Sequence, residues 1–277
     1  MLSTKQNYSS QNSLMIQATN NVIARRIDIE RSDAVMMARR AGITPDLWQA
    51  DLLRSSDKQM ILNCSRQSGK STISAVLGVH QAIYTPGSLV LLLSPSLRQS
   101  QELFRKIKDI YNALESPAMP KPIEESALRL ELSNGSRIVA LPGTEQTVRG
   151  FSNVALLICD EAASCEDPLF FSIKPMLAVS GGRIILLSTP RGKRGFFHDV
   201  WANGGAAWNR TRITARECPR ISEQWLEREK EAMPDFWFRQ EFECQFVESM
   251  DSVFSFDEVQ ATLSDTLEPF YFEGDIG

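Results

Sequence analysis

The chain has 277 residues, of which 43% are hydrophobic and 23% charged, and its formal net charge is −4. This composition predicts an ordinary globular protein with one main domain. No run of about 18 apolar residues is present, and the polar N-terminus lacks the apolar segment of a signal peptide. We therefore expect no membrane span and a cytoplasmic location.

Cysteine spacing and charge distribution exclude some further classes of protein. The five cysteines are scattered without a C-x-x-C pair, which argues against a disulfide framework and a zinc site. Residues 183–220 hold eight Lys or Arg against two acids, whereas residues 221–277 hold three against fifteen. The overall acidity argues against a protein that coats nucleic acid, but it allows one basic face that contacts phosphates.

The N-terminal part, residues 1–41, is expected as a tail followed by a helix. The first thirteen residues are polar and predict an irregular segment. A helical pattern runs over residues 14–41 and ends at Gly42.

Residues 42–205 repeat short apolar runs that end in polar turns, which is typical of strands buried on both faces of a parallel sheet. These strands are expected at residues 60–64, 88–94, 154–160 and 183–188. Helical patterns follow the first two, at residues 72–83 and 97–114. Alternating apolar residues flank Asn134 and Gly135, which predicts an antiparallel hairpin joined to the sheet.

Beyond residue 205 the pattern changes, and residues 206–255 predict a small lid. It would begin with a strand, continue as an acidic helical region, and lead into a linker at residues 256–277. We expect the lid to pack on the sheet through its large aromatic residues. These are Trp225, Phe236, Trp237 and Phe238.

The stretch CSRQSGKST, residues 64–72, departs from the phosphate loop G-x-x-x-x-G-K-S/T only at Cys64. The predicted strand before it and helix after it are the context that gives the motif meaning. Cys64 ends the strand and need not contact phosphate. Gly69 lets the backbone approach the phosphates, Lys70 reaches their outer oxygens, and the Ser71 hydroxyl suits Mg²⁺. The loop predicts a bound nucleotide.

Two adjacent carboxylates, Asp160 and Glu161, follow the apolar strand at residues 154–160. Asp160 can hold Mg²⁺ through its coordination shell, and Glu161 can polarise the attacking water. Adjacent strand residues point to opposite faces, so the turn that begins there must redirect one of them. A glutamate base and the absence of an N-K-x-D guanine motif favour ATP over GTP. The pair predicts Mg-ATP hydrolysis.

Other residues extend this prediction. Phosphoryl transfer needs positive charge on the developing γ-phosphoryl group. Arg66 in the loop can supply it in cis, and Arg149, eleven residues before Asp160, can supply it to a neighbouring subunit. Trp48 and Gln49 suit stacking on adenine and hydrogen bonding to it, although Trp48 suits the core equally.

A polar turn follows the strand at residues 183–188. The hydroxyls of Ser188 and Thr189, before Pro190, are placed to sense the γ-phosphate and relay its loss. A flexible basic loop comes next, and it suits contact with a phosphate backbone or a solvated turn equally. Its three cations are Arg191, Lys193 and Arg194.

Over about residues 43–250, the segments LWQ, SRQSGKST, TVRG, LLICDEAA and LLSTP resemble, in order and spacing, the ATPase domain of large terminase subunits. These are the DNA-packaging motors of tailed bacteriophages, and their phosphate loops replace the first glycine and carry Arg-Gln. The resemblance implies an α/β P-loop NTPase of the additional-strand, RecA-like class. Such a fold has a mostly parallel central sheet flanked by helices and a small C-terminal lid.

The resemblance also implies roles for particular residues. Gln49 is similar to the adenine-contacting glutamine, Asp160 with Ser71 to the magnesium site, and Glu161 to the catalytic glutamate. Residues 188–190 resemble the coupling motif, and Arg149 the arginine that acts in trans. With the interpretation above, the predicted nucleotide contacts are Trp48, Gln49, Arg66, Gln67, Ser68, Gly69, Lys70, Ser71 and Thr72.

For the assembly, the resemblance implies ATP and Mg²⁺ as cofactors and translocation of double-stranded DNA into a procapsid in the host cytoplasm. The partners would be the small terminase subunit and further copies in a ring, expected as a pentamer on the capsid portal. Full large terminases carry a C-terminal nuclease domain, and residues 256–277 are expected as a linker towards it, so no nuclease activity is expected here.

Two alternatives remain open from the residues. A helicase-like DNA translocase of superfamily 2 shares glutamine-type adenine recognition and the D-E-A sequence, but it needs a second RecA-like domain. A nucleotide-bound binding module would not need Glu161 as a second carboxylate.

Overall fold

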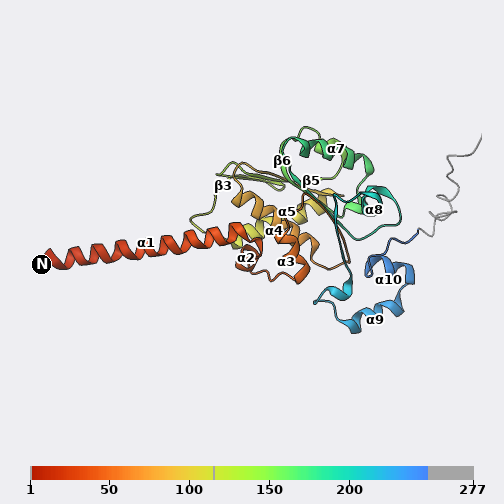
Figure 1. The fold of residues 1–277 in the computed structure, drawn as a ribbon, viewed down its shortest axis with the longest axis horizontal. Coiled ribbons are helices and arrows are strands. Elements are labelled where there is room, and N and C mark those ends of the chain that lie inside the picture. Colours follow the sequence, from red (N-terminus) through yellow and green to blue (C-terminus); the bar gives the residue numbers. More distant parts are fainter. Residues whose placement is uncertain (1, 115, 249–277) are drawn as a thin grey trace, which may run out of the picture.

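The computed structural model describes residues 2–114 and 116–248, which form one eight-stranded sheet with the order β3-β4-β5-β2-β6-β7-β1-β8 (Figure 1). The strands are β1 (Gln59–Cys64), β2 (Leu89–Ser94), β3 (Pro122–Glu125), β4 (Arg129–Leu132), β5 (Arg137–Pro142), β6 (Val154–Asp160), β7 (Arg183–Ser188) and β8 (Asn209–Ile213). The strands predicted from the four apolar runs are all present.

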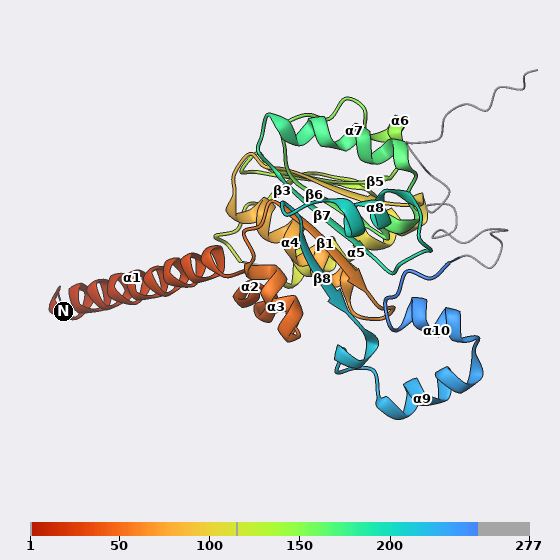
Figure 2. The ribbon, with the colours of Figure 1, turned by 45° about the vertical axis from the view of Figure 1, so that its right-hand side comes forward.

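Helices cover both faces of this sheet. Figure 2 shows α4 on one side and α7 on the other. The helices are α1 (Leu2–Ser32), α2 (Ala34–Arg40), α3 (Leu47–Arg54), α4 (Lys70–Tyr84), α5 (Leu97–Ala113), α6 (Glu145–Val148), α7 (Asp167–Ala178), α8 (Gly195–Asn203), α9 (Glu223–Ala232) and α10 (Asp235–Glu241). Among the described residues, no helix has the length and apolar character needed to cross a membrane.

Strand order gives the class of the fold. In the described residues, the neighbours from β5 to β8 in this order pair in parallel, and β4 pairs antiparallel with both β3 and β5. Strand β7 lies between β1, which leads into the phosphate loop, and β6, which ends in the carboxylate pair. This inserted strand confirms the predicted additional-strand, RecA-like fold.

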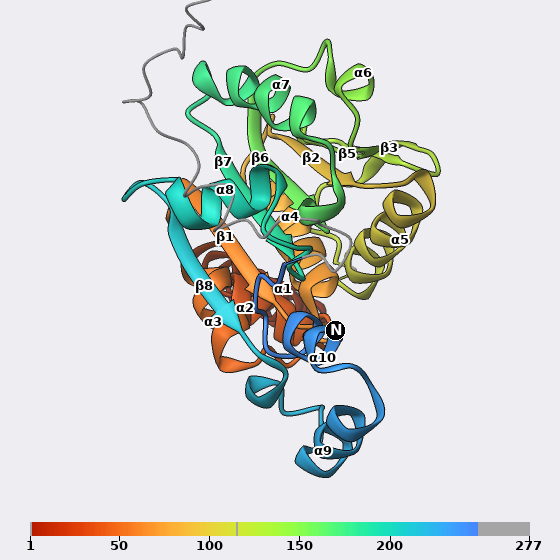
Figure 3. The ribbon, with the colours of Figure 1, turned by 90° about the vertical axis from the view of Figure 1, so that its right-hand side faces the viewer.

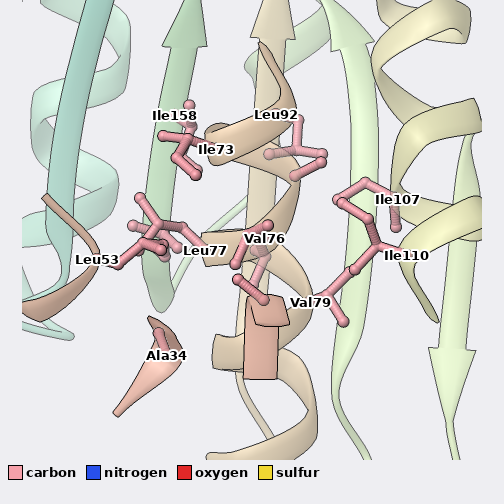
Figure 4. Packing of buried hydrophobic residues seen from close by; sticks show 14 of the residues in the cluster. Ala34, Leu53, Ile73, Val76, Leu77, Val79, Leu92, Ile107, Ile110 and Ile158 are labelled. Carbon is pink, nitrogen blue, oxygen red and sulfur yellow. The ribbon is translucent and has the colours of Figure 1, made fainter. Parts of the chain in front are cut away.

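Alternate residues of the central strands pack on opposite faces. Leu92 of β2 and Ile158 of β6 belong to the core under α4 and α5, and Figure 4 shows them against Ile73 of α4. Their neighbours Leu91 and Leu157 belong to the core under α7 and α8. Because both faces are covered, both sets of side chains must be apolar, which explains the continuous runs in the sequence.

The hairpin at Asn134 and Gly135 is also confirmed. Strands β4 and β5 are antiparallel, with Leu130 opposite Ile138, and β5 continues the sheet in parallel with β2. Gly135 has a φ of +80°, the left-handed conformation that favours glycine at such turns.

The N-terminal part differs from the prediction. The helix begins at Leu2, so the irregular segment expected over the first thirteen residues was wrong; no Pro or Gly occurs there to stop a helix. The single helix expected over residues 14–41 is divided at Asp33. Its side chain accepts a hydrogen bond of 2.9 Å from the backbone N–H of Val35 and so caps α2. Figure 1 shows α1 extending away from the body.

The lid also differs. Strand β8, expected at its start, pairs with β1 and belongs to the main sheet. Of the four aromatic residues expected to pack on the sheet, only Phe238 is buried, and it packs in a small separate cluster with Leu226 and Phe242. Helix α9 lies apart from the sheet (Figure 3). Trp225 of α9 and Trp237 of α10 are partly exposed. The predicted linker lies outside the described residues.

Candidate nucleotide site

The phosphate loop begins where β1 ends, at Cys64, and it leads into α4 at Lys70. The Cys64 side chain is completely buried in the core, and this burial raises the pKa of its thiol well above the usual range. The residue at the first motif position is therefore a neutral core group at the end of the strand, as the sequence predicted.

Gly69 is the position where the loop requires glycine. Its φ is +90°, and a Cβ there would lie 2.7 Å from the Gln49 amide nitrogen. That nitrogen donates to the Ser68 carbonyl at 3.0 Å, and the amide oxygen of Gln49 accepts from the Asp46 backbone N–H at 2.9 Å. Gln49 is buried, and both ends of its amide hold the loop against the start of α3.

Lys70 lies at the centre of the site and is 5% exposed. Its Nζ donates to the Ser65 carbonyl at 3.1 Å and to Thr189 Oγ1 at 3.2 Å, and it lies 3.7 Å from Glu161 Oε1. The ammonium group thus joins the loop, the end of β6 and the end of β7.

Ser71 and Asp160 form the second contact across the site. The Ser71 hydroxyl donates to Asp160 Oδ2 at 2.6 Å, and Asp160 is 5% exposed at the end of β6. Burial, with the nearby Glu161 charge, raises the pKa of the Asp160 carboxyl, while the Ser71 hydrogen bond and Lys70 oppose that rise.

The oxygen atoms of this pair fit Mg²⁺, which prefers hard oxygen ligands. In proteins this ion is usually coordinated by one or two protein groups together with water and phosphate oxygens. In the described part of the chain no group of three or more His, Cys, Asp or Glu residues forms a complete metal cage. Ser71 and Asp160 are the residues at this site that could hold the ion together with phosphate oxygens.

Glu161 leaves the line of its strand. Its φ of 53° and ψ of 42° place it in the left-handed region, so the turn redirects its side chain away from the alternation that ends at Asp160. The turn is tied to β7, because the Ala163 backbone N–H donates to Ser188 Oγ at 3.1 Å and that hydroxyl donates to the Thr189 carbonyl at 2.8 Å. The predicted redirection of one carboxylate is confirmed.

Two arginines connect the loop to the lid. Arg66 Nε lies 2.5 Å from Glu241 Oε2, and the Arg66 backbone N–H donates to the Glu241 carbonyl at 3.1 Å. Arg220 pairs with both oxygens of Asp46, at 2.8 and 2.7 Å, and donates to the Ser68 carbonyl at 2.9 Å. Sequence reasoning missed Arg220, because only its place at the end of the basic stretch distinguishes it.

The structure collects most of the predicted residues around one cavity of about 730 Å³. The predicted residues in its lining are Arg66, Gln67, Ser68, Gly69, Lys70, Ser71, Glu161, Thr189, Pro190 and Arg191. Residues that the sequence did not suggest also line it, from helix α5, the turn after β6, and the lid. They are Gln99, Lys106, Ser164, Trp237, Gln240 and Glu241.

Some predicted residues lie elsewhere. Trp48 is 9% exposed and packs in the core, and Thr72 lines a second cavity. Arg149 is exposed just after α6 and is not part of either lining.

The three cations of the basic loop do not lie together: Arg191 lines the nucleotide cavity, and the other two lie outside its lining. Arg191 Nη1 donates to Ser164 Oγ at 3.3 Å, inside the nucleotide cavity. Lys193 Nζ lies 3.1 Å from Glu248 Oε1, and Arg194 is exposed at the start of α8.

This fold and site define a P-loop nucleotide-binding domain of the additional-strand class. The family model described as "Terminase large subunit, T4likevirus-type, N-terminal" matches residues 61–261. The chain therefore belongs to the terminase large subunit family.

Individual relatives agree with this assignment. The large terminase subunit of Thermus virus P23-45 is 28% identical over 247 residues, which cover 77% of this chain and 51% of that protein. The large terminase subunit of Escherichia phage T5 is 24% identical over 219 residues, covering 74% and 48%. The chain thus spans about half the length of the curated relatives that it matches.

Among solved structures, the ATPase domain of the Thermus phage P74-26 large terminase has a TM-score of 0.62 at 20% identity, covering 76% of this chain and 97% of that domain. The large terminase of a thermophilic bacteriophage, solved in complex with ATP-gamma-S, has a TM-score of 0.56 at 12% identity, covering 69% and 48%. At these identities the likeness establishes the fold.

Proposed function

We propose that the chain is the ATP-hydrolysing motor domain of a viral large terminase and drives double-stranded DNA into a procapsid. The observation that carries the proposal is the convergence of Lys70, Ser71 and Glu161 on one cavity, with Asp160 hydrogen-bonded to Ser71, in a chain of the terminase family. The thermophilic bacteriophage terminase solved with ADP and with ATP-gamma-S supports a nucleotide as the ligand.

Lys70 has the central role in binding. Its ammonium group is already buried and held by the Ser65 carbonyl and Thr189 Oγ1, so it exchanges these acceptors for phosphate oxygens when the triphosphate enters. The loop N–H groups and the start of α4 add their dipoles. Mg²⁺, held by Ser71 and Asp160, would neutralise charge on the phosphate oxygens.

Glu161 acts as the base. It lies 3.7 Å from Lys70 in the structure, and a phosphate that takes over the lysine releases the carboxylate to orient the attacking water. Arg66 must leave Glu241 to place its charge on the γ-phosphoryl group in cis. Arg149, exposed and outside this cavity, is proposed to act on a neighbouring subunit.

The coupling residues contact both halves of the site. Thr189 accepts from Lys70, and Ser188 holds the turn that carries Glu161, so loss of the γ-phosphate changes the surroundings of the end of β7. Pro190 follows at the cavity wall and leads into the basic loop. We propose that this loop contacts the DNA backbone through Lys193 and Arg194, with Arg191 turned towards the nucleotide.

For the assembly, we propose a homo-oligomeric ring, expected as a pentamer, on the capsid portal in the host cytoplasm. The small terminase subunit would be a further partner.

The test is ATP binding and phosphate release by the purified chain with Mg²⁺. Glu161→Gln should retain ATP affinity and lower the hydrolysis rate by about 10²–10⁴-fold, since only the base is removed. The isolated chain should hydrolyse ATP slowly, because an arginine from a neighbouring subunit is missing. The two proteins are therefore compared by their rates of single-turnover ATP hydrolysis. Equal hydrolysis by both proteins would contradict the role of Glu161.

A second measurement separates the motor from its rivals. With full-length large subunit and procapsids, we expect ATP-dependent protection of duplex DNA from added nuclease. Strand separation of the duplex instead would indicate a helicase, and ATP binding without any hydrolysis would indicate a binding module.

A further inference from the structure

A second cavity, of about 650 Å³, adjoins the phosphate cavity. The two share Gln67, Gly69 and Lys106 in their linings, so they lie next to each other along the loop. We propose that this second cavity holds the adenine base of ATP, stacked on Trp225 of the lid. The inference rests on the proposed function and adds to it the residue that recognises the base.

The direction of the nucleotide follows from the loop. The terminal phosphates belong beside Lys70 and Ser71, where the ammonium group and the hydroxyl meet Glu161 and Asp160. The next residue of α4, Thr72, lines the second cavity and not the first. The phosphate chain therefore runs outward past the start of α4, and its nucleoside end enters the second cavity.

The wall opposite the loop presents an aromatic ring. Trp225 is 39% exposed, and Phe242 packs on it edge to face, with ring centroids 5.4 Å apart at an interplanar angle of 79°. Phe242 is itself 9% exposed, and Ile221 completes the apolar side of the lining. A partly exposed indole supported by a second ring suits stacking on a base, since every base offers a π face.

Arg220 fixes the position of Trp225 relative to the phosphate loop. It precedes Ile221 directly and links Asp46 to the Ser68 carbonyl, two residues before Lys70. The first residues of the lid are therefore fixed relative to the phosphates, and Arg220 is a positioning residue for the base.

The residues expected to read the base occupy other positions. Trp48 packs in the core, and Gln49 uses both ends of its amide within the protein. Neither lines either cavity in the part of the chain that the structure describes. In our proposal Gln49 positions the loop, and Trp225 takes over stacking.

The experiment compares two probes, ATP and inorganic tripolyphosphate, each titrated calorimetrically into the purified chain with Mg²⁺. Trp225→Ala should weaken ATP binding about tenfold and leave tripolyphosphate binding unchanged within about twofold, because only ATP carries a base. Trp225→Phe should restore most of the ATP affinity. The matched control is Phe236→Ala, which removes an aromatic side chain of the lid that lines neither cavity and should leave the binding of both probes unchanged.

Each outcome is informative. Unchanged ATP affinity in Trp225→Ala would overturn the proposal, and so would an equal loss for ATP and tripolyphosphate, which would indicate damage to the lid or loop. Retained tripolyphosphate binding also shows that the variant is folded. Failure of the unchanged chain to bind either probe would refute the proposed function itself and is distinguishable from the other results.

Discussion

The sheet side of the nucleotide site and its lid side are built in opposite ways. On the sheet side, Lys70 begins α4 and Asp160 ends β6, and most hydrophobic side chains of these two elements are buried in the main core. On the lid side, the buried cluster within the described residues consists of Ala215, Leu226, Phe238 and Phe242, and two indoles are left partly exposed. In the proposed binding mode the phosphates meet the well-packed sheet side, while the remainder of the nucleotide meets a part with little core of its own, which suits a moving element.

Matched phenylalanines test this contrast most directly. Phe104 of α5 is 1% exposed in the main core, and Phe238 of α10 is 2% exposed in the lid cluster. Phe104→Ala should lower the free energy of unfolding by about 3–5 kcal/mol. Phe238→Ala should leave the global transition nearly unchanged and increase amide exchange only across α9 and α10. Denaturant unfolding and hydrogen exchange measure the two effects, and equal global losses would show that the lid unfolds with the sheet.

A smaller loss of stability is expected from a substitution in the phosphate loop. Gly69→Ala places a Cβ 2.7 Å from the Gln49 amide in a backbone with φ of +90°, so both conformation and contact oppose it. We expect a loss of about 1–3 kcal/mol in stability and a clear loss of tripolyphosphate affinity. Gly42→Ala is the control, because its φ is +78° with nothing described within 4 Å of the added Cβ. An equal loss of affinity in both variants would contradict the role of the close approach.

The smallest effect concerns the link between the two sides. A double-mutant cycle on Arg220 and Asp46 should give a coupling of about 0.5–1 kcal/mol, since the arginine is half exposed and solvent screens the pair. The control cycle uses Arg54 and Asp33, 2.8 Å apart with similar arginine exposure, which join helices on the sheet side. Only the Arg220 variants should increase amide exchange at the start of the lid. Exchange that rises equally in both cycles would show that Arg220 does not link the lid to the loop.

The sequence predicted the strands, the hairpin and the parallel sheet because each of these depends on local pattern. It also predicted the phosphate loop and the redirected carboxylate, and Lys70, Ser71, Asp160 and Glu161 meet at one place in the structure. The prediction of a single N-terminal helix was wrong, because Asp33 caps a second helix within an uninterrupted helical pattern. The predicted packing of the lid aromatic residues was also wrong, because their burial depends on partners distant in sequence.

What the sequence determined alone was the phosphate chemistry, because a loop of nine consecutive residues, 64–72, and an adjacent carboxylate pair carry most of it. Tertiary structure decided which groups surround the rest of the proposed nucleotide site. Gln49 and Arg220 are 171 positions apart by their numbers, yet both donate to the Ser68 carbonyl. Likewise Trp48 and Trp225 are both indoles in helices, and only the packing of the chain buries one and presents the other to the cavity. Short-range patterns encode backbone geometry, whereas the exposure of a side chain depends on every element that folds against it.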